Sequence, residues 1–383
     1  MENFPRGRTA IVGAATYGLG EAPGQKPLDM AAQAARLALA DANLALKDVD
    51  ALFVCTPDDA LSGLSAAEYL GIQPRFTENN RTGGSAFHSH LIVASLMLDC
   101  GYCDTALIIY GSNQRTGAGG LVSMRLPSAY EKPYKPMTPL SSYAMAAARH
   151  MHEYGTTRRD LAEVAVAARQ WANLNPDAFA RGELSIEQCL SARMVSDPLS
   201  TRDCCLITDG AAAVVMTRAD RARDLGVQPV YVLGAAAATW YSSIDQAADL
   251  TVTAARESGA RAYAQAGLGP ADIDMVQLYD AFTINTILFL EDLGFCPKGE
   301  GGRFVQDGNI APGGTLPVNT NGGGLSFGHP GMYGLFTLVE SCVQLRGQAG
   351  ERQVAGARTA LAHANGGTLA SQSSVILATE EVL

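Results

Sequence analysis

The feature that most constrains the fold of this chain is an internal repeat. The segment 38–50 has alanines at alternate positions, then a leucine and an acidic pair, and the segment 262–274 repeats this pattern. The offset between the two is constant, since 268 − 44 and 274 − 50 both give 224. In each copy the pattern predicts an Ala-rich helix, an acidic turn and an apolar strand. A chain of 383 residues with such a repeat is expected to fold as two related halves.

Helical and strand patterns alternate in both halves. The first half is expected to contain strands at 9–14, 51–55 and 105–110 and helices at 28–42 and 85–98. The second half is expected to contain strands ending at 279, 363 and 378 and helices at about 282–294 and 335–345. This alternation predicts an α/β fold with helices covering a parallel or mixed sheet. We place the two halves at 1–225 and 226–383.

The segment 115–197 has no counterpart in the repeat. It contains four prolines between 127 and 139 and two helical stretches, 142–154 and 159–172. We interpret it as an insertion that covers one face of the first half. Loops of this length in compact proteins usually form lids or binding segments.

Composition excludes several classes of protein. The net charge is −10 and no basic stripe or tail is present, so neither nucleic acid nor an anionic membrane is an expected partner. The N-terminus lacks the layout of a signal peptide, and no apolar run approaches the roughly 20 residues of a membrane span. We expect a cytoplasmic protein. Of eight cysteines, only Cys100 and Cys103 form a C-x-x-C pair, and without a second pair no metal site is predicted.

A glycine-rich stretch at 318–334 contains the first candidate functional residue, His329. Because Pro330 follows it, His329 is disfavoured in a helix and is expected on a loop. Three glycines at 322–324 would allow the backbone to approach a ligand closely. The alternative is a Gly-rich connection in which the histidine has no chemical role.

Several motifs resemble those of a known family, the thiolase superfamily. The run 318–323, followed by Gly-His-Pro at 328–330, resembles the thiolase motif, and 209–212 matches the thiolase Asp-Gly-Ala-Ala turn. Tyr-Asp-Ala-Phe at 279–282 falls where the sterol-carrier branch has His-Asp-Cys-Phe, and 290–302 and 344–347 also resemble that branch. The resemblance implies a five-layered α/β/α/β/α sandwich, a homodimer and an acyl-CoA thioester substrate, with no cofactor bound besides the coenzyme A of the substrate.

One departure from the family bears on the mechanism. A thiolase has its nucleophilic cysteine on the loop before the long buried helix of the first half, and Arg81 stands at that position here. Arginine stays protonated and cannot attack a thioester. The other thiolase cysteines are replaced by Ala281 and His363. Ser85 could serve as a nucleophile with His329 as its base, or it could only cap the helix that follows.

The remaining residues suit chemistry without a covalent intermediate. His329 and backbone N–H groups could hold the oxyanion of a thioester enolate, and Tyr279, at the end of a strand, could act as a base if the site lowered its pKa. Cysteine-free relatives include steroid side-chain aldolases, whose tyrosine motif resembles that at 279–282. Their second tyrosine is absent here, where Phe327 precedes Gly328 and His329. Alternatively, Tyr279 is simply a buried tyrosine at the end of a strand.

The sequence therefore predicts a set of site residues. The catalytic candidates are Tyr279, Asp280, His329 and His363, and the substrate-binding candidates are Arg81, Ser85, Asn319, Gly323, Ser326 and Gly366. We expect the motif of His363, Asn365, Gly366 and Gly367 to face the same pocket as Tyr279, and Asp280 to orient its neighbours or cap the next helix.

Three functions remain open at this stage. The first is retro-aldol cleavage of a 3-hydroxyacyl-CoA, and the second is an acyl transfer that uses histidines in place of cysteine. The third is a non-catalytic carrier of lipid or acyl-CoA. The resemblance also implies a possible partner, a small companion protein with an OB-fold and a zinc ribbon.

Overall fold

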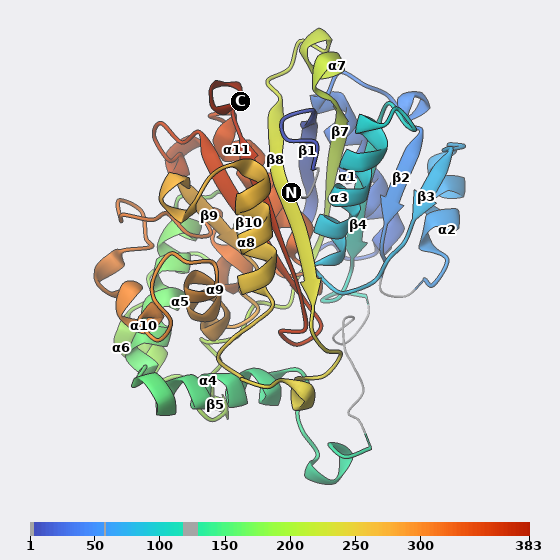
Figure 1. Cartoon of the computed structure of the whole chain (residues 1–383). Helices are drawn as coiled ribbons and strands as arrows, with labels where there is room; N and C mark the ends of the chain where they lie inside the picture. Colours follow the sequence, from blue (N-terminus) through green and yellow to red (C-terminus); the bar gives the residue numbers. More distant parts are fainter. Residues whose placement is uncertain (1–3, 57–58, 118–128) are drawn as a thin grey trace.

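The computed structural model describes residues 4–56, 59–117 and 129–383. Within them, nine strands form one mixed sheet in the order β3-β2-β4-β7-β1-β8-β11-β10-β9 (Figure 1). Their bounds are β1 Thr9–Gly20, β2 Ala51–Val54, β3 Phe76–Glu78, β4 Ala106–Ser112, β7 Asp209–Arg218, β8 Val230–Thr239, β9 Met275–Leu278, β10 Thr359–Gly366 and β11 Ser371–Ala378. Two short strands, β5 Met194–Ser196 and β6 Leu199–Ser200, pair separately.

The helices occupy the segments between these strands. Their bounds are α1 Pro27–Asp41, α2 Ser62–Leu70, α3 Ala86–Asp99, α4 Leu140–Tyr154, α5 Arg158–Asn173, α6 Ile186–Leu190, α7 Ala219–Asp224, α8 Ala255–Ala266, α9 Thr283–Asp292, α10 Gly301–Phe304 and α11 Gly334–Leu345. The α/β fold expected from the sequence is confirmed.

The predicted duplication is visible in the strand order. Reading inward from each end of the sheet, β2-β4-β7-β1 in one half corresponds to β9-β10-β11-β8 in the other. β2 and β9 start and end 224 residues apart, as 275 − 51 and 278 − 54 show. The same close approach of helix to strand recurs as well: Gly13 of β1 abuts the carbonyl of Ala38, and Gly234 of β8 abuts that of Ala262. A Cβ atom at either glycine would clash with the helix backbone.

The helices define the layers around this sheet. α1 packs on β1, β4 and β7, and α8 packs on β8 and β11, so these helices are the outer layers. α3 and α11 contact strands of both halves and form the layer between them. The result is the α/β/α/β/α arrangement, in which β1 pairs with β8 at one edge and thereby joins the two halves.

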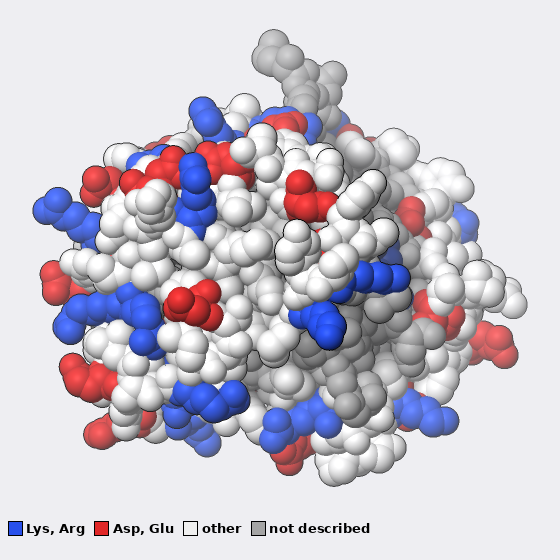
Figure 2. Space-filling view, turned by 90° about the horizontal axis from the view of Figure 1, so that it is seen from below, with Lys and Arg blue, Asp and Glu red and all other residues white. Residues whose placement is uncertain are grey.

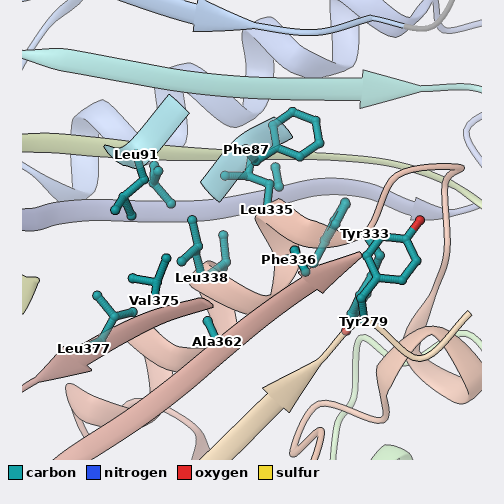
Figure 3. Close-up of a cluster of buried hydrophobic side chains, with 14 of the residues drawn as sticks. Phe87, Leu91, Tyr279, Tyr333, Leu335, Phe336, Leu338, Ala362, Val375 and Leu377 are labelled. Carbon is teal, nitrogen blue, oxygen red and sulfur yellow. The ribbon is translucent and has the colours of Figure 1, made fainter. Parts of the chain in front are cut away.

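The core between the halves is apolar and close to fully buried. Figure 3 shows side chains of α3 and α11 meeting those of β10 and β11, among them Phe87, Leu91, Leu335, Phe336, Leu338, Val375 and Leu377. Burying a side chain of this size contributes roughly 1.5–3 kcal/mol each. This packing fixes the ends of α3 and α11, where the candidate site residues lie.

The segment between the halves differs from its expected position. We expected a cover over the first half, but α4 and α5 pack against α9, and α5 also packs on the turn at 323–327, all in the second half. Part of the predicted insertion, residues 118–128, lies outside the described residues.

The surface charge and the helix lengths bear on the two partners that the sequence analysis excluded, nucleic acid and membranes. Figure 2 views the molecule from below Figure 1, and it shows acidic and basic side chains spread around a broad uncharged area. No continuous basic patch is visible on that face. In the part of the chain that the structure describes, no helix is long and apolar enough to cross a bilayer.

Candidate active site

A cavity of about 640 Å³ opens where the two halves meet the segment that carries α4. Its walls come from the loop before α3, the start of α4, the segment 204–207, the turn after β8 and the ends of β9 and β10. β9 and β10 run parallel, so their carboxyl ends meet at this edge of the sheet. Reacting groups are commonly placed at such an edge in α/β enzymes.

Tyr279 and His329 form the centre of this cavity. The phenol oxygen of Tyr279 lies 2.9 Å from Nε2 of His329 and 3.3 Å from the carbonyl oxygen of Gly331. Both side chains line the cavity and are more than nine-tenths buried. The ring of Tyr279 fits here because Gly84, at the start of α3, has no Cβ; one would clash with the ring.

The histidine is anchored from the first half of the chain. Its backbone N–H donates to Oγ1 of Thr208 at 2.9 Å, and its carbonyl accepts from Nε2 of Gln114 at 3.1 Å. As expected from Pro330, His329 lies on a loop outside any helix. The Tyr279–His329 pair therefore belongs to the second half and is held in place by residues of the first.

Burial keeps both groups of the pair uncharged. Desolvation lowers the pKa of His329 to about 4, and it raises the pKa of Tyr279 well above its ordinary value. The condition under which the phenol alone would be a good base, a lowered pKa, is therefore not met. At neutral pH the imidazole is unprotonated, so its Nε2 can accept the proton of the phenol.

Asp280 faces away from the cavity. Its carboxylate accepts the backbone N–H groups of Gly324 at 2.6 Å and Leu325 at 3.3 Å, within a π-helical turn at Gly323–Phe327. Burial raises the pKa of Asp280 to about 7, and these N–H donors act in the opposite direction. The side chain thus holds the first turn of this π-helical segment and does not cap the next helix, α9.

The other residues of the Gly-rich motif support this turn. Asn319, with φ of 54°, accepts the N–H of Leu278 at 2.6 Å, and Gly323 packs against the carboxylate of Asp280. Oγ of Ser326 accepts a hydrogen bond from Nε of Arg169 at 3.1 Å. None of them lines the cavity. The glycines at 322–324 lie against protein atoms, among them Ala172 and Asp280.

Two further candidates lie behind the cavity wall. Ser85 makes no capping hydrogen bond; its hydroxyl contacts those of Thr82 and Ser371, each at 3.0 Å. His363 does not line the cavity, contrary to expectation, because both ring nitrogens are bonded within the sheet, to Ser374 and Gln372 at 2.9 Å.

Arg81 and Gly366 do line the cavity, as do several residues that the sequence did not single out. Asn365, part of the motif expected to face the pocket, lines it too. The overlooked residues include Tyr143, Cys204 and Cys205. Tyr143 could not be predicted, because it belongs to α4, in a segment with no repeat counterpart and no motif.

The two cavity cysteines are poor nucleophiles. Desolvation raises the pKa of Cys204 to about 12 and that of Cys205 well above its ordinary value. The thiol of Cys204 also donates to the carbonyl of Ser200 at 3.3 Å. Because the thiolate is the reactive form, neither replaces the cysteine that Arg81 displaces. Among the described residues no group of three His, Cys, Asp or Glu side chains could hold a metal ion.

Comparisons with known proteins agree with this geometry. Residues 236–379 match the family model of the thiolase C-terminal domain. An acetyl-CoA acetyltransferase of Methanothermobacter thermautotrophicus is 37% identical over 373 residues, 94% of this chain and 96% of the relative. A 17-hydroxy-3-oxo-4-pregnene-20-carboxyl-CoA lyase of Mycobacterium tuberculosis is 36% identical, covering 89% of this chain and 92% of the relative. A solved structure, an Ltp2-ChsH2(DUF35) aldolase, superposes with a TM-score of 0.89 at 32% identity, covering 98% of both chains.

With its duplicated sandwich and its pair of cavity residues, the chain belongs to the thiolase superfamily. Within that superfamily it falls in the sterol-carrier-protein-like branch that includes the steroid side-chain aldolases.

Proposed function

We propose that this protein cleaves the C2–C3 bond of a 3-hydroxyacyl-CoA by a retro-aldol reaction. The observation that carries the proposal is the hydrogen bond of 2.9 Å between Tyr279 and His329, in a cavity where Arg81 replaces the nucleophile. The similarity to a lyase and an aldolase that both resemble the whole chain supports it.

The reaction follows from the protonation states of the pair. Tyr279 accepts the proton of the 3-hydroxyl group while its own proton moves to Nε2 of His329. The C2–C3 bond breaks, C3 becomes the carbonyl carbon of the released aldehyde or ketone, and the electron pair forms the enolate of the shortened thioester. The proton then returns through Tyr279 to C2. Coenzyme A takes part only as a portion of the substrate, and no other cofactor is required.

The cavity wall indicates the chemical class of the acyl group. Apolar side chains from α4 and the neighbouring segments line it, including Met137, Leu140, Ile207, Ile244 and Phe282. A volume of about 640 Å³ lies in the range of pockets that enclose a small organic ligand. We propose a bulky apolar acyl group, with Arg81 supplying a permanent positive charge for the negatively charged portions of the thioester.

The first test is turnover by the purified protein. Incubation with a 3-hydroxyacyl-CoA should release a carbonyl compound and a shortened acyl-CoA without added free coenzyme A. Tyr279→Phe should lower kcat by at least about 100-fold, because one general base contributes roughly 10²–10⁴-fold, and it should leave thioester affinity within a few-fold. Undiminished turnover in this variant would remove Tyr279 from the mechanism.

A second candidate function is acyl transfer, favoured by the acetyltransferase that is 37% identical to this chain. The same assay separates the two, because acyl transfer requires an added acceptor such as free coenzyme A. If neither reaction occurs while the thioester still binds, the protein is a carrier.

We also propose a homodimer. Large apolar side chains are exposed beside the edge strand β3, on α2, α3 and the adjoining turns: Leu61, Leu64, Tyr69, Leu96 and Tyr102. An edge strand next to exposed apolar surface is a suitable site for pairing with a second copy. Light scattering after size exclusion should give twice the mass of one chain, and the mass of a single chain would contradict the proposal.

Two finer proposals concern partner and location. The aldolase with the TM-score of 0.89 is described as containing a DUF35 protein, so we propose a small OB-fold, zinc-ribbon companion for this chain. Co-purification with such a protein, encoded by a neighbouring gene, is the test. We propose a cytoplasmic location, to be checked by cell fractionation.

A further inference from the structure

The cavity contains a second phenol, Tyr143, which faces the one already described. It projects from α4, lines the cavity and is 2% exposed. Its ring lies against that of Phe282, with centroids 4.4 Å apart and planes inclined by 30°. The ring is therefore fixed in position before a ligand enters.

A chain of buried side chains reaches the phenol oxygen from behind. Nδ2 of Asn365 donates to it at 2.7 Å, and Nε2 of Gln372 donates to Oδ1 of Asn365 at 2.8 Å. Gln372 in turn bonds Nε2 of His363 at 2.9 Å, and Nδ1 of His363 bonds Ser374 at 2.9 Å. All four side chains behind the phenol are at most 2% exposed.

The chemistry of these groups determines which of them donates in each hydrogen bond of this series. An amide NH₂ group can only donate, so the oxygen of Tyr143 is an acceptor toward Asn365. Its own proton is then available to another acceptor. Besides Asn365, the phenol oxygen contacts the carbonyl of Gly367 at 3.4 Å, which is long for an O–H···O hydrogen bond, and the Asn285 side chain and the Leu369 backbone also lie within hydrogen-bonding reach. A ligand oxygen in the cavity would be a better acceptor.

The reaction proposed above requires a donor at a second oxygen. Cleavage of the C2–C3 bond places negative charge on the thioester oxygen, and a fixed donor there stabilises the transition state. We expected His329 to take this part, but its Nε2 is bonded to Tyr279. Among the described residues, Tyr143 is a cavity-lining phenol whose oxygen already accepts a buried donor.

We propose that Tyr143 is a further catalytic residue, which donates its O–H to the thioester oxygen as the enolate forms. Asn365 and Gln372 are positioning residues that hold the phenol oxygen and orient its proton toward the cavity. This inference rests on the proposed retro-aldol function. It also gives His363 a place in the site, three hydrogen bonds from the phenol oxygen of Tyr143.

The test compares two tyrosines that each lose a buried hydroxyl group. Tyr143→Phe should lower kcat by about 100-fold or more, with thioester affinity within threefold of the wild type, as for removal of an oxyanion donor. The control is Tyr263→Phe, in α8 and away from the cavity, which loses a bond of 3.1 Å to the carbonyl of Leu293. It should lower thermal stability and leave kcat unchanged. Equal kcat in Tyr143→Phe and the wild type would overturn the inference.

A second variant separates orientation from mere packing. Asn365→Asp keeps the shape of the side chain but replaces the donor with a carboxylate, which would accept the proton of Tyr143. We expect kcat to fall as in Tyr143→Phe while the melting temperature changes little. Full activity in Asn365→Asp would show that the direction of the hydrogen bond between Asn365 and Tyr143 is irrelevant to catalysis. It would refute the positioning role of Asn365.

A measurement without turnover distinguishes failure of this inference from failure of the proposed function. With 3-fluorotyrosine at position 143, binding of a saturated acyl-CoA that lacks the 3-hydroxyl group should shift the ¹⁹F resonance. An unmoved resonance at saturating ligand would overturn the contact between Tyr143 and the thioester. Absence of cleavage by the wild type, with the resonance still shifted, would instead overturn the retro-aldol function and leave Tyr143 as a binding residue.

Discussion

At the scale of single residues, the Tyr279–His329 pair and the cavity thiols are uncharged at rest. Burial lowers the pKa of His329 to about 4 and raises the pKa values of Tyr279 and of the cavity thiols. Protons can pass between such groups without a stable ion forming, whereas burial disfavours a thiolate at Cys204 and Cys205.

The thiols allow a test at this scale. Cys205→Ala should retain turnover within a few-fold, because an un-ionised thiol does not attack a thioester. Iodoacetamide should inactivate the enzyme slowly, as only thiolates react quickly, and Cys100→Ala serves as a control that removes an exposed cysteine. Rapid, stoichiometric inactivation that disappears in Cys205→Ala would restore a cysteine mechanism.

At the scale of elements, the sequence predicted the helices and strands whose residues follow a regular pattern. The helix expected at 85–98 is α3, Ala86–Asp99, and the strand expected to follow the second acidic turn is β9, Met275–Leu278. The π-helical turn at Gly323–Phe327 could not be predicted, since an N–H group of its first turn bonds a carboxylate 44 residues earlier, as 324 − 280 gives. His363 was placed too near the cavity for a geometric reason. It lies two residues before Asn365 in β10, about 7 Å deeper along the strand.

The π-helical turn offers a test of this dependence. Asp280→Ala should lower the free energy of unfolding by about 2–6 kcal/mol, because two buried N–H groups lose their acceptor at roughly 1–3 kcal/mol each. Asp220→Ala is the control: this carboxylate is exposed and pairs with Arg218 at 3.3 Å, so the change should be within about 0.5 kcal/mol. Urea unfolding measures both. Equal stabilities of the two variants would contradict the role given to Asp280.

At the scale of the whole molecule, the two halves share one interior that contains several neutral histidines. Burial lowers the pKa of His88, His90 and His329 to about 4 and that of His363 to about 3. The repeat predicted this double architecture from the sequence alone. It could not predict that the cavity would be completed by α4, because helix packing between distant segments leaves no local pattern.

These histidines predict how stability depends on pH. Each binds a proton more readily in the unfolded chain, near pH 6.5, than in the folded one, so its contribution is complete above pH 6.5 and is lost as the pH falls toward about 4. The loss approaches about 1.4 kcal/mol per pH unit for each histidine. Asp280 acts oppositely between pH 7 and 4, since its raised folded pKa favours the protonated folded state. Chemical unfolding between pH 8 and 4.5 should show a steep net decline, and a flat profile would contradict the burial of neutral histidines.

Tyr143 reaches the cavity from α4, which has no counterpart in the other half of the molecule. One group of the cavity is therefore encoded apart from the duplicated scaffold that carries Tyr279 and His329. A change confined to one appended helix would alter the groups that meet the substrate while the ancient doubled frame stayed intact. Diversification in this lineage is accordingly expected to leave its clearest trace in that appendage, where sequence comparison has the least to align.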